Sequence, residues 1–127
     1  MCELVSMDTN FGTSISVADI KKRNIENIIR AAADCNKIDA IILFGSSLEK
    51  RCKEESDIDI AVVSNTVRSR LFRSKSYDNF TTKVYQADRR QDYDILQFNS
   101  EEAIQNSKEC ICREIIEKGK VIYKRGL

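Results

Sequence analysis

The chain has 127 residues, of which 42% are hydrophobic and 32% are charged, and its formal net charge is +1. This length suits one modest domain over residues 1–127, and the composition is that of a folded protein rather than a disordered one. The near-zero total charge gives no general indication of nucleic-acid or membrane binding.

The chain begins with an acidic segment that is followed by a predicted helix. Ser16 and Asp19 have the spacing of a helix-capping box, and apolar residues then recur near the helical period, which predicts a helix over residues 17–36. Residues 38–44 form a short, isoleucine-rich apolar run that ends at Gly45. Such a run is typical of a buried strand.

The next predicted strand, residues 57–63, has two chemically different faces. Because side chains alternate along a strand, Asp57 and Asp59 share one face, while Ile58 and Ile60 share the other. The sequence therefore predicts a strand with a core side and a polar, chemically active side.

The second half of the chain continues the alternation of helices and strands. Apolar spacing predicts one broken helix or two short helices over residues 66–90, with the interruption at residues 77–79. Residues 93–98 read as a strand, residues 99–118 as a helix that the following glycine ends, and residues 121–123 as a short last strand. This order predicts the α/β (α+β) class, with a small mixed sheet and helices packed on one face.

The five cysteines show no metal or disulfide pattern. No pair has the CxxC spacing, and the chain has no histidine to complete a zinc set. We therefore expect reduced thiols in a cytoplasmic protein. The opening MCELVSMDTN lacks the apolar stretch of a signal peptide, and no apolar run approaches the roughly 18 residues of a membrane span. No membrane partner is expected.

The paired aspartates point to phosphate chemistry. Carboxylates that face the same way repel one another, and a divalent cation is one compensation. An oxygen-only set that includes Asp57, Asp59 and Asp94 suits Mg²⁺, and three acids on adjacent strands can hold two ions for in-line attack on phosphorus. Gly45 lets backbone approach closely, and Ser46 adds a hydroxyl donor for phosphates.

Other chemistries fail on residue type or spacing. A calcium loop would need an oxygen ligand near Ala61 and a glycine in place of Val62. The chain has neither GxGxxG nor GxxxxGK[ST], and the lack of histidine excludes a Ser-His-Asp triad and a His-ligated zinc site.

Three short segments together resemble a known superfamily. The letters FGS at 44–46, SDID at 56–59 and YDI at 93–95 are similar to the motifs of the nucleotidyltransferase superfamily that includes DNA polymerase β, most closely its minimal nucleotidyltransferase branch. The closing segment 113–123 is similar to the helix-Gly-strand ending of that family, so the resemblance covers roughly residues 17–123. It implies the nucleotidyltransferase fold.

The resemblance also implies roles for the three acids. Asp57 and Asp59 are expected to bind two Mg²⁺ ions that carry a nucleoside triphosphate. Asp94 is expected to complete the catalytic metal site and to help deprotonate the acceptor hydroxyl.

The triphosphate tail is expected to lie on Gly45, Ser46 and Lys50. Family members often have an arginine directly after Gly-Ser and a glycine three positions later, where this chain has Ser47 and Lys50. Lys50 reduces the flexibility of the turn and supplies a charge that reaches phosphate.

The function that follows from the resemblance is transfer of AMP from ATP to a hydroxyl. A protein acceptor is expected, with this chain as the antitoxin of a toxin–antitoxin pair and a small helical protein as its toxin partner. The alternatives are a catalytically weak nucleotide- or partner-binding module and an aminoglycoside-type antibiotic nucleotidyltransferase. The latter usually carries an added helical domain, for which this chain has no room.

The middle of the chain is basic. Residues 64–92 carry 7 basic against 3 acidic side chains, so this segment is expected to meet an acidic or polyanionic partner; RNA is possible but not favoured.

Overall fold

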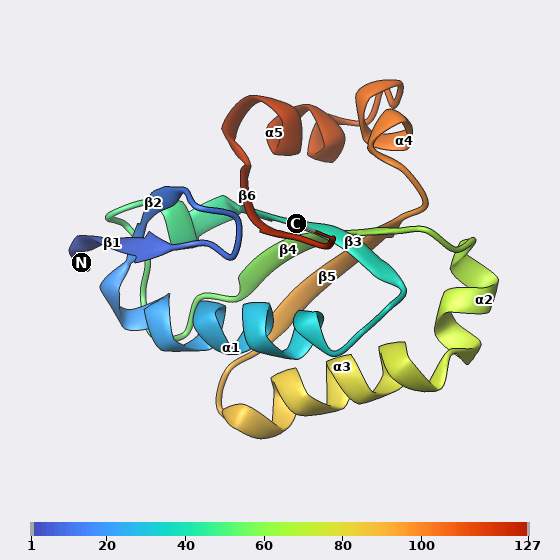
Figure 1. Cartoon of the computed structure of the whole chain (residues 1–127). Helices are drawn as coiled ribbons and strands as arrows, with labels where there is room; N and C mark the ends of the chain where they lie inside the picture. The colour runs from blue at the N-terminus through green and yellow to red at the C-terminus, as the bar shows by residue number, and fades with distance from the viewer. Residues whose placement is uncertain (1, 127) are drawn as a thin grey trace.

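The computed structural model describes residues 2–126, which form a two-stranded antiparallel sheet, a four-stranded mixed sheet and five α-helices (Figure 1). In chain order the elements are β1 (Leu4–Asp8), β2 (Ser14–Ala18), the 3₁₀ turn η1 (Asp19–Lys21), α1 (Lys22–Ala33), β3 (Ile38–Phe44), the 3₁₀ turn η2 (Gly45–Leu48), β4 (Ile58–Ser64), α2 (Arg68–Arg73), α3 (Lys75–Ala87), β5 (Tyr93–Phe98), α4 (Glu101–Gln105), α5 (Cys110–Lys118) and β6 (Lys120–Lys124). No helix within this range is long and apolar enough to cross a membrane.

Four strands form the central sheet, in the order β5-β4-β3-β6. β3 is antiparallel to β4 and to β6, whereas β4 and β5 are parallel. A parallel pair needs a long crossover connection, and α2 and α3 supply it. The predicted mixed α/β class is thus confirmed, and β1 and β2 add a separate antiparallel hairpin.

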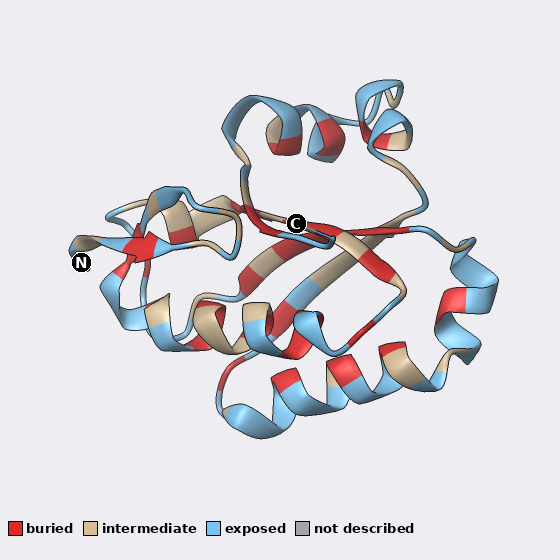
Figure 2. Ribbon diagram, viewed as in Figure 1, coloured by how far each residue is buried: buried red, intermediate tan, exposed pale blue. Residues whose placement is uncertain are grey.

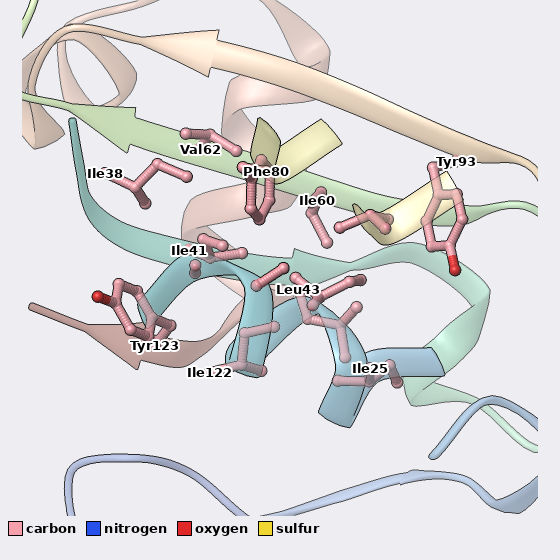
Figure 3. Close-up of a cluster of buried hydrophobic side chains, with 14 of the residues drawn as sticks. Ile25, Ile38, Ile41, Leu43, Ile60, Val62, Phe80, Tyr93, Ile122 and Tyr123 are labelled. Carbon is pink, nitrogen blue, oxygen red and sulfur yellow. The ribbon is translucent and has the colours of Figure 1, made fainter. Parts of the chain in front are cut away.

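Helices cover both faces of the central sheet, which corrects the predicted one-sided arrangement (Figure 1). α1 and α3 pack on one face, where the large buried side chains include Ile25, Ile41, Ile60 and Phe80 (Figures 2 and 3). On the other face, Ala61 and its neighbours form a second core with α4 and α5. The face that begins with the acids of β4 therefore becomes a core surface further along the strand.

The first predicted helix starts later than the sequence indicated. Residues 14–18 form β2, which pairs in register with β1, and α1 begins only at Lys22. Val17 and Ala18 are buried in the hairpin, and the Asp19 side chain accepts a hydrogen bond from the Ile20 N–H at 2.8 Å, in the turn between strand and helix. Pairing with β1 therefore overrides the helical spacing.

Two serines decide where the later helices begin. The predicted break at residues 77–79 lies instead at Ser74, whose side chain accepts a hydrogen bond from the Tyr77 N–H at the start of α3. The predicted helix over residues 99–118 is divided into α4 and α5, and Ser100 caps α4 by accepting from the Ala103 N–H at 3.1 Å. The cap position shifts by one residue from the predicted Asn99.

Candidate active site

Three predicted acids lie at the amino ends of the two parallel strands. The register of β4 and β5 pairs Asp59 directly with Asp94. Asp57 precedes the first residue of β4, two positions before Asp59. Asp57 and Asp94 are exposed and Asp59 is half-buried. The structure therefore brings together the three carboxylates that the sequence singled out.

The electrostatics of Asp59 show how close these acids are. Burial, followed in order of size by the negative charges of Asp94, Asp57 and Glu114, raises its pKa from 3.8 to about 6. Glu114 lies on α5, so the helix above the sheet adds a fourth carboxylate that sequence reasoning did not find. The cluster is short of positive charge and is suited to a cation or a cation-bearing ligand.

Gly45 allows the Asp59 carboxylate to sit against the backbone. Its φ of +78° lies in the region that side chains rarely adopt. A Cβ at this position would overlap Oδ2 of Asp59 and would lie only 3.1 Å from its Cγ. Antiparallel pairing of Phe44 with Asp59 fixes this contact, so the predicted role of Gly45 in close approach has a geometric basis.

A buried lysine ties together the two loops that lead into the acids. Lys21 is 1% exposed, and its Nζ donates to the Glu54 carbonyl at 2.8 Å and to Oε1 of Gln91 at 2.5 Å. Nε2 of Gln91 in turn donates to the carbonyls of Ser56 and Asp92, at 3.0 and 2.7 Å. Lys21 and Gln91 are positioning residues that no linear motif marks, because the network exists only after three distant segments meet.

A cavity of about 440 Å³ opens beside Gly45. The hairpin contributes Ser14 and Ser16 to its wall, and α5 and β6 contribute Lys118 and Lys120. Two lysines thus share the cavity lining with the glycine turn and with Glu49 and Glu114. The volume lies in the range of small-molecule sites.

The hairpin that walls this cavity is fastened at both ends. At its start, the Cys2 N–H donates to the Lys50 carbonyl at 3.1 Å. At its tip, the side chain of Asn10 donates to the Lys124 carbonyl at 2.6 Å and accepts from the Lys124 N–H at 2.9 Å. The wall is therefore a fixed part of the structure.

The remaining predicted phosphate-binding residues lie near the cavity but do not line it. Ser46 follows Gly45 in η2, and Lys50 lies on the exposed turn beyond it. Ser47, which replaces the usual arginine, is completely buried, and within residues 2–126 its hydroxyl has no hydrogen-bond partner. An arginine could not enter this site without displacing the surrounding chain, which gives the departure from the family pattern a structural reason.

The carboxylates of Asp57, Asp59 and Asp94 are suitable ligands for Mg²⁺, although they do not by themselves complete a metal-binding site. Within the described residues, no group of three or more His, Cys, Asp or Glu side chains forms a ready-made metal site. Mg²⁺ commonly takes only one or two carboxylates and completes its shell with waters and substrate phosphates. The crowded carboxylates of Asp59 and Asp94 fit that requirement.

Comparison with known proteins agrees with the fold and the motifs. The family model described as Polymerase beta, Nucleotidyltransferase matches residues 26–126. A solved structure of a mutant of the toxin–antitoxin MntA-HpeT is similar with a TM-score of 0.55 and 20% identity, over 79% of this chain and 73% of that one. A second solved structure, described as a toxin–antitoxin with AMP-PNP, is similar with a TM-score of 0.50 and 21% identity. The similarity covers 80% of this chain and 72% of that one. No curated protein matched the chain.

The fold, and the acids that pair across β4 and β5, define a nucleotidyltransferase. Since the family model covers most of the chain, the protein belongs to the polymerase β nucleotidyltransferase family. The resemblance drawn from the sequence motifs is thereby confirmed. The hairpin before residue 26 lies outside the matched region.

Proposed function

We propose that the protein is a Mg²⁺-dependent nucleotidyltransferase that moves AMP from ATP to a hydroxyl group of a partner protein, as the antitoxin of a toxin–antitoxin pair. The observation that carries the proposal is the register pair of Asp59 and Asp94, on the face that also carries Asp57, beside the positive-φ turn of Gly45. Family membership supports the reaction class.

The nucleotide is assigned to the cavity beside Gly45. Its β- and γ-phosphates would lie between the backbone of the glycine turn and the ammonium groups of Lys118 and Lys120, which line the same cavity. Ser46 and Lys50 would act from the rim of this cavity. In that position the α-phosphorus lies toward the acids.

The acids would hold the metal and the incoming hydroxyl. Asp57, Asp59 and Asp94 would be the Mg²⁺ ligands, and bound Mg²⁺ supplies neutralisation and orientation of the phosphates. The acceptor oxygen bonds to the α-phosphorus as the bond from that phosphorus to the bridging oxygen breaks. Pyrophosphate leaves with the electron pair, and the hydroxyl proton passes to the exposed carboxylate of Asp94.

The partner assignment rests on the similar structures. Both are described as toxin–antitoxin proteins, and one is described with AMP-PNP. A protein partner also suits the exposed basic residues of α2 and the start of α3, which would speed association with an acidic surface.

The decisive experiment compares Asp94→Asn with Asp92→Asn. Asp92 is an equally exposed acid two residues earlier, so it is a matched control for charge. Using ATP labelled on the α-phosphate and the co-expressed partner, we expect Asp94→Asn to lower transfer about 100-fold or more while AMP-PNP binding changes little, because the lost interaction acts chiefly in the transition state. Asp92→Asn should retain transfer.

The reverse pattern would assign the third acid to Asp92. Transfer by neither the wild type nor any variant, with AMP-PNP still bound, would instead identify a nucleotide-binding module that neutralises its partner by contact.

A further inference from the structure

A second cavity lies on the other side of the acids. It is a groove of about 390 Å³ between β5 and α3, lined by Asp94 and by the aromatic side chains of Phe72, Tyr77, Tyr85 and Tyr93. Phe72 is 54% exposed and Tyr85 is 41% exposed, so the groove offers aromatic surface to a ligand. The acid cluster thus separates two cavities of different chemistry.

The two cavities lie on different faces of the sheet, the first beside α5 at Gly45 and Lys120 and the second beside α3 at the edge strand β5, where it reaches Asp94. In the order of the strands, Lys120 lies on β6, Gly45 directly follows β3, and Asp59 and Asp94 lie on β4 and β5. In-line displacement requires the attacking oxygen to enter opposite the leaving group. If the proposed function holds and pyrophosphate leaves toward Gly45, the acceptor enters from the β5 side.

The two edge strands of the central sheet, β6 and β5, differ in how far their outer backbone groups are already hydrogen-bonded. At β6, the side chain of Asn10 occupies both the N–H and the C=O of Lys124 and so closes part of that edge. At β5, pairing within residues 2–126 is with β4 alone. An open edge strand beside a groove is a template for an extended peptide, which gains main-chain hydrogen bonds and side-chain pockets.

The groove has an acidic end and a basic end. At the acidic end lies the Tyr85 hydroxyl, whose pKa is raised by burial and then by Asp92, Asp94 and Asp57, and which donates to the Tyr93 carbonyl. At the other end, Gln97 donates to the Tyr77 hydroxyl at 3.0 Å. Because a strand rises about 3.3 Å per residue, the ends marked by residues 94 and 97 are about 10 Å apart.

The cations of α2 gather at the second end. The guanidinium of Arg68 lies 5.6 Å from the centre of the Phe72 ring and is close enough to Tyr77 to lower the pKa of that hydroxyl, although burial raises it overall. Arg70, Arg73 and Lys75 follow within the same short segment and are exposed. Within the described chain none of these four side chains forms an ion pair with an acid.

We propose that the groove between β5 and α3 binds an extended segment of the acceptor protein, with the acceptor hydroxyl at Asp94 and acidic side chains three to five residues away, against Arg68 and Phe72. The identification of the bound hydroxyl as the AMP acceptor rests on the proposed function. The expected positions of the acidic side chains in the bound segment follow from the groove alone.

Synthetic peptides test the proposal without nucleotide. The probes are fluorescent peptides of about ten residues, long enough at the rise of a strand to span the groove, with a central Ser, Thr or Tyr. One set carries Glu three to five residues before or after the hydroxyl, a second carries Glu directly beside it, and a third carries Lys at the distant positions. We expect fluorescence anisotropy with the full chain to give about tenfold tighter binding for one of the distant-Glu designs than for the other two sets.

Two changes should remove that preference. N-methylation of alternate backbone amides in the peptide should weaken binding about tenfold, because it blocks strand pairing and leaves the protein untouched. Arg68→Glu should do the same, whereas Lys108→Glu, an exposed charge reversal on the loop between α4 and α5, should not. Thermal melting checks that both variants fold.

Equal binding of distant-Glu and Lys peptides, or indifference to N-methylation and to Arg68→Glu, would overturn the groove assignment. AMP-PNP binding and AMP transfer to the partner, measured on the same variants, keep the two proposals apart. Transfer that is unchanged in Arg68→Glu would leave the nucleotidyltransferase function standing and reject the groove. If the chain binds the peptides as expected but binds no nucleotide, the groove assignment stands and the nucleotidyltransferase function is rejected.

Discussion

Replacement of the half-buried acid Asp59 by asparagine should stabilise the metal-free protein at neutral pH. Burial, followed by the charges of Asp94, Asp57 and Glu114, raises the pKa of Asp59 from 3.8 to about 6. The ionised form is therefore disfavoured in the folded chain relative to the unfolded chain. Asparagine has nearly the same shape and carries no charge, so it removes this penalty.

The size of the effect follows from the two pKa values. A shift of about two pKa units corresponds to about 3 kcal/mol, and solvent screening of a half-buried group lowers this to about 1–2 kcal/mol. For a domain of this length we expect the melting temperature of Asp59→Asn to rise by about 3–8 °C at pH 7.5.

The sign of the pH dependence is equally specific. Between pH 4 and pH 6 the folded wild type binds more protons than the unfolded chain, so its free energy of unfolding falls as the pH rises through this window. Above pH 6 the penalty is complete, and below pH 4 it is absent. The gain from Asp59→Asn should therefore be small at pH 4 and should reach a plateau above pH 6.5.

Thermal melts from pH 4 to pH 8 in the presence of a chelator provide the assay, because a bound cation would offset the repulsion. Asp92→Asn, at an exposed acid of the neighbouring loop, is the control and should shift the melting temperature much less. A gain that does not change with pH, or a loss of stability at pH 7.5, would refute the argument that the acid cluster is uncompensated.

Two further substitutions test the geometry around this cluster. Gly45→Ala should reduce the free energy of unfolding by about 2–4 kcal/mol in urea titrations, since it combines backbone strain with overlap on the Asp59 carboxylate. Gly12 also has a positive φ, of +84°, but open space surrounds it, so Gly12→Ala should lower the free energy of unfolding by only about 1 kcal/mol. Equal losses in the two variants would mean that the Asp59 carboxylate does not lie against Gly45. Asn10→Ala should lower stability by about 1–2 kcal/mol and speed hydrogen exchange at the Lys124 amide; unchanged protection of that amide would contradict the clamp at the hairpin tip.

The parts of the fold that the sequence predicted well are those with a local signal. β3 and β5 match their predicted ranges, and β4 is shifted by one residue, because continuous or alternating apolar residues mark buried strands. The acids were found for the same reason, since alternation alone places Asp57 and Asp59 on one face.

The parts that the sequence did not predict depend on distant partners. Over the short segment before α1, apolar spacing fits a helix as well as a strand, and only pairing with β1 decides between them. Ala61 and Val63 gave no sign that α5 would cover them. Glu114 and Lys21 reach the site from elements far from the acids in the chain, so no motif could include them.

The network around Lys21 ties the arrangement of the acids to three separate segments of the chain. Gln91 joins the loops before β4 and β5, and the ammonium group of Lys21 donates both to Gln91 and to the first of these loops. A fragment that stops before Gln91 contains Asp57 and Asp59 but lacks the residue that joins their loop to the loop before Asp94. Assembly of the acid cluster therefore depends on folding of the segment that leads through β5, and not on Asp57 and Asp59 alone.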